Sequence, residues 1–495
     1  MPQDRPNLLS VLTVNAAYAG ASAVGWPYYL YLLATRPKYR AHMGERWGLV
    51  PHFDPERPRF WVHAISVGEV EAARTFVPAL AEAYPEAEIV VSTTTLTGRE
   101  RARERFPDRP VFHFPLDLWP CVAAAFRRVN PSAVIQVESE WWPNFFFAAA
   151  RRRVPVVCVN VRLTERGARG YRRMRPIMRQ VLGCVSAIGV QAEVYRDRLV
   201  GLGADPARIR VTGQMKHDGV TFADTVEGAD ALARAAGLAP DEPVLVAGST
   251  GPGEEQPLLQ AYRRVRAAGL PLRLVLVPRR PESFDGAAEA IRAAGLPLLR
   301  RSESMDGNAD SPGATDHSFT RDAPGATDGS SIRAAGSAST VWQANRGTRP
   351  SNAEPPVILG DTMGELMRWY ALADVVFVGR SLVPIGGSNP MEPGSLARPM
   401  LWGPEMFNFP VEAPALVAAG AAREVTGADD LADAVKDLLT HPDRRRQMGA
   451  AGRDTIRGMQ GATARNIDLV REVVGAPGAT GGSSASASRR GEDTG

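Results

Sequence analysis

Residues 244–278, VLVAGSTGPGEEQPLLQAYRRVRAAGLPLRLVLVP, contain an apolar run, a loop of small residues, a helical pattern and a second apolar run. Apolar, β-branched strands that alternate with helices are typical of a parallel sheet covered on both faces. The alternation continues through PPVILGD, the helical stretch MGELMRWYALA and the run ADVVFVGR. This part of the chain therefore predicts a doubly wound α/β domain.

The same alternation occurs earlier in the chain, where RFWVHAIS, AEIVVSTTT, PVFHFP, SAVIQVES and VPVVCVNVR are predicted strands. We predict an N-terminal domain over 36–212 and a C-terminal domain over 213–473, with a cleft that faces the carboxyl ends of the strands. Residues 301–355 are rich in Ser, Gly, Ala, Asp and Thr, and predict a disordered insertion. We also predict that residues 474–495 form a disordered tail.

Residues 6–35 carry no charge, and a bilayer core needs roughly 20 apolar residues. Aromatic side chains gather near the end of this stretch, at Trp26, Tyr28, Tyr29 and Tyr31, and basic residues follow from Arg36. Basic residues after such a segment favour a cytoplasmic body. We therefore expect a membrane anchor over 1–35. The alternative is a buried helix of a soluble protein.

The composition excludes several classes of protein. The 495 residues contain 58 Lys and Arg against 54 Asp and Glu, a net charge of +4, which argues against a nucleic-acid partner. Three cysteines cannot form a disulfide framework and indicate a reducing compartment. The chain has no HExxH and no Asp-x-Asp motif, so we expect no metal site of either kind. No GxGxxG follows a strand, which argues against a nicotinamide dehydrogenase.

Two loops of the C-terminal half suit a nucleotide. In SLVPIGGSNPMEPGSLARPM, Gly386 and Gly387 free the backbone, Asn389 adds a donor and Glu392 lies in a first helical turn. A carboxylate there can accept both hydroxyls of a ribose; the alternative is a glutamate that only complements the helix dipole. The loop after VLVAGST offers free N–H groups to a phosphate or a carboxylate, although many such loops are only turns. Gly360–Leu366 also follows a predicted strand, and its position at the strand's carboxyl end suggests the same nucleotide pocket. The alternative is that Asp361 only caps the helix that follows.

The N-terminal half offers acidic candidates. Glu45, just past the anchor, can take a proton from a lipid-borne hydroxyl, or can be a surface ion-pair partner. The turn that holds Ser66 and Gly68 can bind an anion. Glu138 and Glu140 are alternate residues at a strand end, so both can face the cleft, where we prefer hydrogen bonding or structural support to metal ligation. A stretch from Arg162 to Arg179 holds seven arginines that suit phosphate or form a solvated face.

These stretches together resemble the 3-deoxy-D-manno-octulosonic acid (Kdo) transferases of lipopolysaccharide synthesis. The matching segments fall in the family's order over roughly residues 36 to 470, without the insertion, and are GERWG, WVHAISVGEVEAA, VSTTTLTGRE, PLDLWP, VESEWWPN, NVRLTERGARGY, VTGQMKHD, VAGSTGPGEE, VPRRPE, LGDTMGELM, SLVPIGGSNPMEP and GPEMFNF. An N-terminal anchor fits the family as well.

The resemblance implies a GT-B fold, in which two Rossmann-like domains face a cleft. It implies an inverting glycosyltransferase that needs no bound metal or cofactor and moves Kdo from CMP-Kdo to a lipid A precursor at the cytoplasmic face of the inner membrane. Carried over by motif, Glu45 is the catalytic base. The CMP-Kdo pocket is implied to contain Ser249, Thr250, Arg279, Met363, Gly364, Gly387, Asn389 and Glu392.

The chain departs from the family pattern at several positions. Ser388 and Gly251 stand where the family usually has histidine, Arg380 replaces a usual glycine, and His217 stands where an aromatic is common. The lost histidines put the donor in question. Two other interpretations therefore stay open: a GT-B transferase that uses another activated sugar on a lipid acceptor, and a membrane-anchored binding protein without activity.

Overall fold

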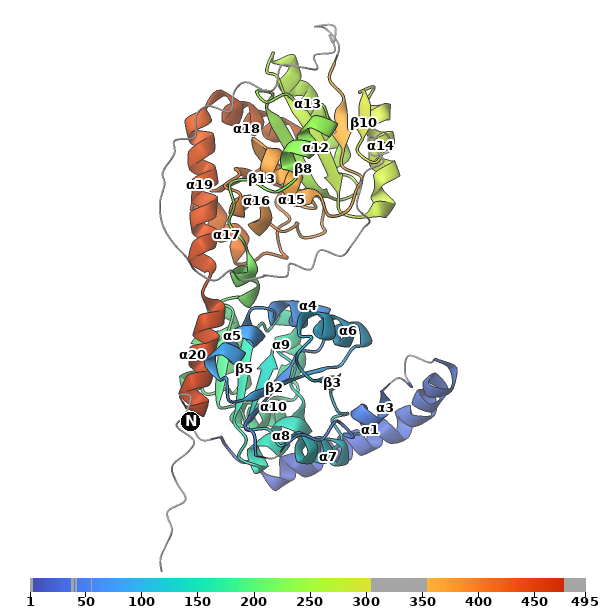
Figure 1. Ribbon diagram of the computed structural model, residues 1–495, viewed down its shortest axis with the longest axis vertical. Helices are drawn as coiled ribbons and strands as arrows, with labels where there is room; N and C mark the ends of the chain where they lie inside the picture. The colour runs from blue at the N-terminus through green and yellow to red at the C-terminus, as the bar shows by residue number, and fades with distance from the viewer. Residues whose placement is uncertain (1–2, 37–39, 41, 55, 304–353, 476–495) are drawn as a thin grey trace, which may run out of the picture. The chain divides into compact units, whose positions relative to one another are not determined.

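The computed structural model of the protein describes residues 3–36, 40, 42–54, 56–303 and 354–475 (Figure 1). The chain divides into two compact units: unit 1 is Met1–Thr221 with Ile456–Gly495, and unit 2 is Phe222–Thr455. The insertion predicted over 301–355 and the tail predicted from 474 lie outside the described residues, apart from their edges at 301–303, 354–355 and 474–475.

Unit 1 is built on a seven-stranded parallel sheet in the order β3-β2-β1-β4-β5-β6-β7. Alternate residues of β1 enter different cores: Trp61 packs on one face of the sheet, and Phe60 and Val62 pack on the other. Burial on both faces explains the continuous apolar runs in the sequence. The strands are β1 Arg59–His63, β2 Glu88–Thr93, β3 Val111–His113, β4 Ala133–Val137, β5 Val156–Val161, β6 Ala187–Val190 and β7 Ile209–Val211.

Helices cover both faces of this sheet (Figure 1). They are α3 Met43–Arg46, α4 Val67–Ala72, α5 Phe76–Ala83, α6 Leu96–Arg105, α7 Trp119–Val129, α8 Pro143–Arg151, α9 Glu165–Arg172, α10 Arg175–Gly183, α11 Glu193–Leu202 and α20 Ala462–Val474, with short 3₁₀ turns at Pro206–Arg208 and Met215–Gly219.

The last helix, α20, belongs to unit 1, whereas the sequence placed it in the C-terminal domain over 213–473. Its apolar residues Ile467, Leu469 and Val470 complete one core of unit 1. The Asp218 carboxylate accepts hydrogen bonds from the backbone N–H groups that begin α20, including that of Gly461 at 2.6 Å. The sequence-based prediction used a single domain boundary, so it missed that the chain returns to unit 1 after it has formed unit 2.

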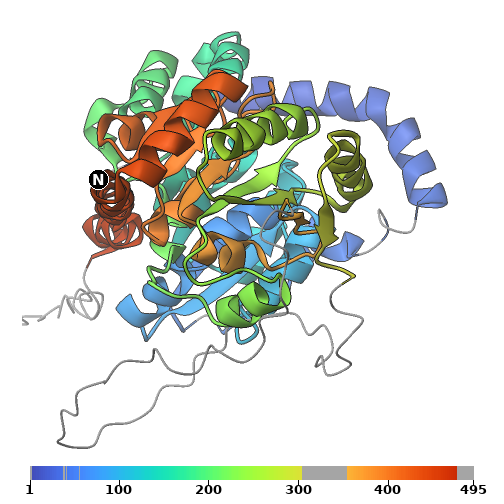
Figure 2. The same cartoon turned by 90° about the horizontal axis from the view of Figure 1, so that it is seen from above.

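The chain begins with a long apolar helix, α1 Leu8–Thr35, as the sequence predicted. It is long and apolar enough to cross a membrane, and its window Leu8–Gly25 is only 11% buried. Figure 2 shows that α1 bends in its second half, where Pro27 interrupts the hydrogen-bond ladder of the helix.

Unit 2 has its own seven-stranded parallel sheet, in the order β10-β11-β9-β8-β12-β13-β14. The strands are β8 Val244–Thr250, β9 Arg273–Pro278, β10 Leu298–Arg300, β11 Val357–Leu359, β12 Val375–Val378, β13 Met400–Trp402 and β14 Ala422–Glu424. The helices are α12 Ala229–Ala235, α13 Glu255–Ala267, α14 Phe284–Ala293, α15 Leu366–Leu372, α16 Met391–Ser395, α17 Glu412–Ala418, α18 Ala428–Thr440 and α19 Pro442–Met459, whose last turn enters unit 1, with a 3₁₀ turn at Pro281–Ser283.

In each unit the strand order reverses beside the first strand: β1 lies between β2 and β4, and β8 lies between β9 and β12. The carboxyl ends of strands at such a reversal are where open α/β sheets bind ligands. The predicted fold class, two doubly wound α/β units, is confirmed. The two reversals direct attention to the loops after β1 and β4 and to those after β8 and β12.

Candidate active site

Glu45 lies in α3 and is held by two contacts within unit 1. Its Oε1 accepts a hydrogen bond from Arg99 Nη2 at 2.7 Å, and its Oε2 accepts one from the backbone N–H of His113 at 2.7 Å. The Glu45 side chain is 18% exposed, so it is neither fully buried nor a freely solvated surface group. Each oxygen keeps a further lone pair. The carboxylate is therefore fixed in orientation and still able to accept a proton.

Positive and imidazole groups surround Glu45. Arg99 is nearly buried in α6, and its Nη1 lies 2.9 Å from Nε2 of His42. Burial lowers the pKa of His113 to about 4, with further lowering by Arg46 and Arg99, so this imidazole is neutral near pH 7. The sequence did not single out Arg99 or His113 as site residues. Arg99 lies in the stretch VSTTTLTGRE, which is one of those that carry the family resemblance, and His113 lies in a predicted strand.

The loop after β4 carries Glu138 and Glu140. Both were predicted to share a strand face, but β4 ends at Val137, so they lie in the loop and the alternation of a strand does not place them. They are nonetheless near each other, because Glu138 raises the pKa of Glu140 in addition to the effect of burial. Glu138 has a φ of 62°, a strained value for a residue that is not glycine.

A third carboxylate, Glu69, joins this group. Burial raises its pKa to about 7; a hydrogen bond from Ser66 opposes the shift, and the nearby Glu138 and Glu140 add to it. The backbone N–H of Ser66 donates to Glu69 Oε2 at 2.7 Å. The turn that was predicted to bind an external anion thus already binds a carboxylate of the chain. Gly68 lies in the first turn of α4, next to this contact.

The arginine-rich stretch lies partly in α9 and α10. The Arg162 side chain is exposed, and its carbonyl accepts a hydrogen bond from the Ser139 hydroxyl. Arg169 and Arg172 approach Glu165 at 3.9 and 3.6 Å. A phosphate-binding role for this stretch therefore stays a prediction.

In unit 2 the loop after β8 is organised by Glu254, which is fully buried. Its carboxylate accepts four backbone hydrogen bonds at 2.5 to 2.9 Å, from the N–H groups of Gly251, Arg380, Ser381 and Leu382. These N–H groups come from the loops after β8 and after β12, so Glu254 fastens the two loops together. Such N–H groups form anion sites in other proteins. Here the chain's own carboxylate fills that site, which motif spacing had left open for a ligand.

Ser249 and Thr250 end β8 in close contact with the neighbouring loops. Ser249 has a φ of 53°, and its carbonyl accepts a hydrogen bond from Ser388 Oγ at 3.0 Å. The carbonyl of Thr250 accepts one from the N–H of Arg279 at 3.0 Å. A Cβ on Gly379 would lie 2.5 Å from the Thr250 Cα, so only glycine permits this approach of the two backbones. The loops after β8, β9 and β12 therefore meet at one edge.

Three guanidinium groups gather at this edge. Burial lowers the pKa of Arg380, and the like charges of Arg279 and Arg280 lower it further, with Glu254 opposing them. Like charges held together in this way are relieved by an anion between them. Arg380 also has a φ of 62°, in the region that favours glycine. The edge is thus both positively charged and strained.

Asn389 and Glu392 lie at the start of α16 and contact each other. Asn389 Nδ2 donates to Glu392 Oε1 at 3.1 Å. Burial raises the pKa of Glu392, while Asn389 and the charge of Arg279 act in the opposite direction. Gly387, with a φ of 79°, brings the backbone so close to Met406 that a Cβ would lie 2.3 Å from its Sδ. The predicted donor residues on these loops are therefore brought together.

Met363 and Gly364 follow β11 in an exposed turn; Met363 is 67% exposed and Gly364 has a φ of 86°. Asp361 does not cap α15. Its carboxylate accepts hydrogen bonds from Arg300 Nε at 2.7 Å and from the N–H of Ser302 at 2.8 Å. The residue thus holds the chain that follows β10. Among the described residues, no three His, Cys, Asp or Glu side chains are placed to hold a metal ion together.

The chain matches known proteins over most of its length. Residues 41–219 match the family model described as 3-deoxy-D-manno-octulosonic-acid transferase (kdotransferase). A 3-deoxy-D-manno-octulosonic acid transferase of Haemophilus influenzae is 32% identical over 90% of this chain and 94% of its own. One of Bordetella pertussis is 30% identical over 84% of this chain and 87% of its own.

The fold has a match among solved structures. A glycosyltransferase from Rickettsia africae superimposes with a TM-score of 0.51 at 10% identity, covering 84% of this chain and 98% of that one. That likeness shows the fold alone and agrees with the GT-B class predicted from the sequence. The family is shown by the relatives. The chain belongs to the 3-deoxy-D-manno-octulosonic acid (Kdo) transferases, and is a glycosyltransferase that transfers Kdo in lipopolysaccharide biosynthesis.

Proposed function

We propose that unit 2 binds CMP-Kdo and that unit 1 presents a hydroxyl of a lipid A precursor to Glu45. The observation that carries the donor assignment is the group of three arginines at the edge where the loops after β8, β9 and β12 meet. The donor's phosphate and carboxylate are anions that guanidinium forks bind through paired hydrogen bonds. Arg380 is half-buried, and the like charges of the exposed Arg279 and Arg280 disfavour its charged form, which a bound anion would offset.

The loops next to these arginines suit the nucleoside. Glu392 is half-buried and keeps one carboxylate oxygen apart from its contact with Asn389, so it can accept from a ribose hydroxyl. Glu254 occupies the N–H groups of the first loop. The donor phosphate is therefore expected to depend on side chains, chiefly Arg279 and Arg380, more than on that loop's backbone.

Glu45 is proposed as the catalytic base. The acceptor oxygen attacks the anomeric carbon of Kdo from the face opposite CMP; the new C–O bond forms as the bond to the CMP phosphate breaks. The hydroxyl proton passes to the Glu45 carboxylate, and CMP leaves with the electron pair. A positioned base contributes roughly 100- to 10,000-fold. Arg99 and the His113 N–H keep the carboxylate in one orientation for this step.

The acceptor is a lipid, and we propose that the protein works at the cytoplasmic face of the inner membrane. The apolar helix α1 ends at Thr35, ten residues before Glu45, and seven of its large hydrophobic side chains are exposed, among them Leu9 at 73% and Val24 at 84%. An exposed apolar helix shortly before the base in the chain suits an acceptor that stays in the bilayer.

The test uses the purified full-length chain with CMP-Kdo and a tetraacylated lipid A precursor, with the product identified by its mass. Glu45→Gln is expected to abolish transfer while CMP binding, measured by calorimetry, is unchanged. Glu71→Gln is the matched control, because Glu71 is also paired with arginines in unit 1 but is not at the site. Near-normal turnover of Glu45→Gln would remove Glu45 from this role. If UDP, and not CMP, competed for the donor site, the donor would be another activated sugar.

A further inference from the structure

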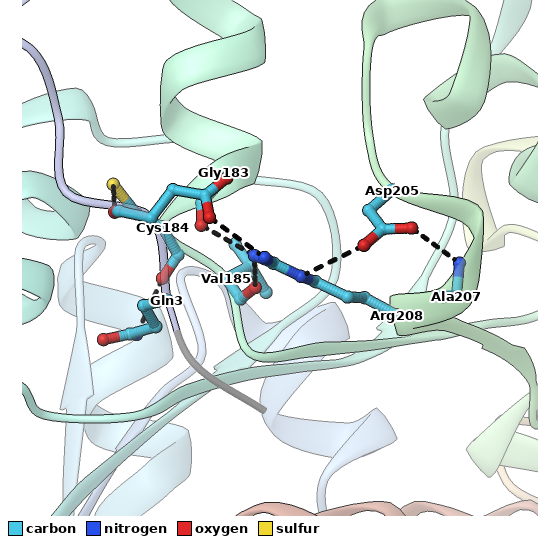
Figure 3. Close-up of polar contacts among 8 residues, drawn as sticks. Gln3, Gly183, Cys184, Val185, Asp205, Ala207 and Arg208 are labelled. Atoms are coloured by element: carbon cyan, nitrogen blue, oxygen red, sulfur yellow. Dashed lines mark hydrogen bonds and ion pairs between the residues drawn. The ribbon is translucent and has the colours of Figure 1, made fainter.

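The two ends of α1 both lead into contacts with unit 1. Before the helix, the N–H of Asp4 donates to the Gly183 carbonyl at 2.9 Å, and its carboxylate accepts from Arg208 Nη2 at 3.1 Å. Gln3 Nε2 donates to the Cys184 carbonyl at 2.7 Å, and Figure 3 shows Gln3 beside Cys184, with Arg208 reaching toward the same segment. The residues that precede α1 are therefore fastened to the body.

The first half of α1 is fastened as well. Val11 and Val14 are buried in the core of unit 1. Tyr18 Oη donates to Asp117 Oδ2 at 2.8 Å, and Asn15 Nδ2 donates to Asn144 Oδ1 at 3.1 Å. Figure 1 shows α1 passing beneath α8 and then leaving the body.

These contacts are specific, because Asp117 is itself part of the fold. It is 8% exposed and accepts the N–H groups of Asn144 and Phe145 at the start of α8, at 3.1 and 2.8 Å. Removing Tyr18 from it would leave a buried carboxylate with one partner fewer, which is costly. Two polar side chains of α1, Asn15 and Tyr18, therefore attach the helix to unit 1.

The geometry leaves too little chain for a crossing. From Tyr18 to Thr35 a helix extends about 26 Å, at about 1.5 Å per residue, whereas a bilayer core is about 30 Å thick. From Thr35 the chain must reach His42, which contacts Arg99 in unit 1. Those seven residues reach at most about 25 Å when fully extended. A helix that crossed the bilayer after Tyr18 could not return to unit 1 over that distance.

We propose that α1 does not span the membrane but lies in its interface, with the segment before it and the body of the protein on the same side. This inference rests on the proposed membrane location, and it specifies that the protein attaches to one leaflet and does not cross the bilayer. Exposed apolar side chains run along both halves of the helix: Leu8, Leu9, Leu12, Val24, Tyr28, Leu30 and Tyr31 are 47% to 84% exposed. A helix that lies in the interface can bury exposed apolar side chains of this kind among the acyl chains.

Charge favours a lipid bilayer as the occupant of this face. Helices α8 and α10 pack against α1. They carry or directly precede exposed arginines at 151, 152, 153, 175 and 179, and Arg36 and Arg40 follow α1 and are exposed. Basic side chains beside an apolar helix attract anionic headgroups, each by about 1 kcal/mol near the surface.

The first experiment labels single cysteines with a membrane-impermeant maleimide, in intact spheroplasts and in inverted inner-membrane vesicles. The native Cys121, Cys158 and Cys184 are buried and supply the background. Arg5→Cys reports the segment before α1, and Glu82→Cys is the matched control on the exposed face of α5. The proposal expects both to be labelled in inverted vesicles and neither above background in spheroplasts. Labelling of Arg5→Cys in spheroplasts alone would overturn it.

The second experiment tests whether the helix stays on the body in the membrane. In Asn15→Cys/Asn144→Cys, an oxidant is expected to form the cross-link in membranes, and Val24→Cys/Asn144→Cys is the control pair that should not cross-link. Absence of the first cross-link in membranes, or recovery of the chain as a soluble dimer with α1 between copies, would overturn the proposal. Neither readout uses activity, so a failure of the proposed transfer reaction leaves this test unaffected.

Discussion

Replacing Glu254 by glutamine tests how the donor loops of unit 2 are held. In the structure Oε2 accepts the N–H groups of Gly251 and Arg380, and Oε1 accepts those of Ser381 and Leu382. A glutamine has one oxygen, so in either orientation its NH₂ group faces two N–H donors. Two hydrogen bonds to a charged acceptor are lost, and each is worth about 1.5 to 3 kcal/mol.

The expected loss is therefore about 3 to 6 kcal/mol in the free energy of unfolding of unit 2, a large part of the 5 to 15 kcal/mol that is usual for a domain. Pulse proteolysis of the full-length chain across a urea series measures it, with fragments of unit 2 followed separately. Because Glu254 joins the loops that carry the donor residues, CMP affinity should fall in the same variant.

Glu255→Gln is the matched control for that experiment. Glu255 is the next residue and accepts one backbone hydrogen bond, from Gly253 at 2.8 Å, which an amide oxygen can accept equally well. Its unfolding free energy should stay near that of the wild type. If Glu254→Gln were within about 1 kcal/mol of Glu255→Gln, the four-bond account of the loops, which depends on charged acceptors, would be wrong.

Four other outcomes are expected. Arg99→Ala should lower kcat by about 100-fold through loss of the orientation of Glu45, with CMP affinity unchanged, and Arg99→Lys should restore part of it. Arg380→Ala should weaken CMP-Kdo binding by roughly tenfold, less at high salt. Gly379→Ala should destabilise unit 2 by about 1 to 3 kcal/mol, because its Cβ would meet backbone at 2.5 Å. Folding raises the pKa of Glu69 from 4.5 to about 7, so its protonated side chain stabilises the fold fully below about pH 4.5, and this contribution is lost as the pH rises through about 7. The difference in unfolding free energy between wild type and Glu69→Gln, measured across this pH range, should fall accordingly.

The sequence predicted the fold well because its signals are local. Buried parallel strands such as β4 and β5 are mostly apolar, with one polar residue each, and every residue in them is buried. The short helices α9 and α10 were not predicted, because glycine and arginine dominate α9 and leave only Ala168 of that helix buried. The position of α20 could not be predicted, since it depends on contacts with strands far away in the sequence.

Site residues that belong to a local motif could be predicted from the sequence. Residues that join the site only through tertiary contacts could not. Glu45 came from a motif, and its partners Arg99 and His113 did not. Arg99 is 54 residues from Glu45, and Glu254 is 126 residues from Arg380. A buried carboxylate that accepts backbone N–H groups from another loop leaves no periodic trace in the sequence.

The loop after the first strand of each unit contains the same hydrogen bond. Ser66 N–H donates to Glu69 after β1, and Gly251 N–H donates to Glu254 after β8, each three residues along the chain. A glutamate at that spacing fills the N–H groups at which an external anion would otherwise bind. Positive charge for a donor phosphate then has to come from side chains.

Two of the departures from the family pattern, Gly251 and Arg380, lie next to each other in the structure. A Cβ at Gly251 would lie 3.1 Å from the Arg380 Cγ and 3.1 Å from the Ile385 Cδ1, so a larger residue at 251 would require one of these side chains to shift. Arg380 in turn takes a φ of 62°, which suits the glycine that the family usually has there and strains any other residue. A side chain at position 251 and the Arg380 side chain would therefore compete for the same space. If this edge binds the donor as proposed, the positive charge beside position 251 comes from Arg380, whose backbone is strained.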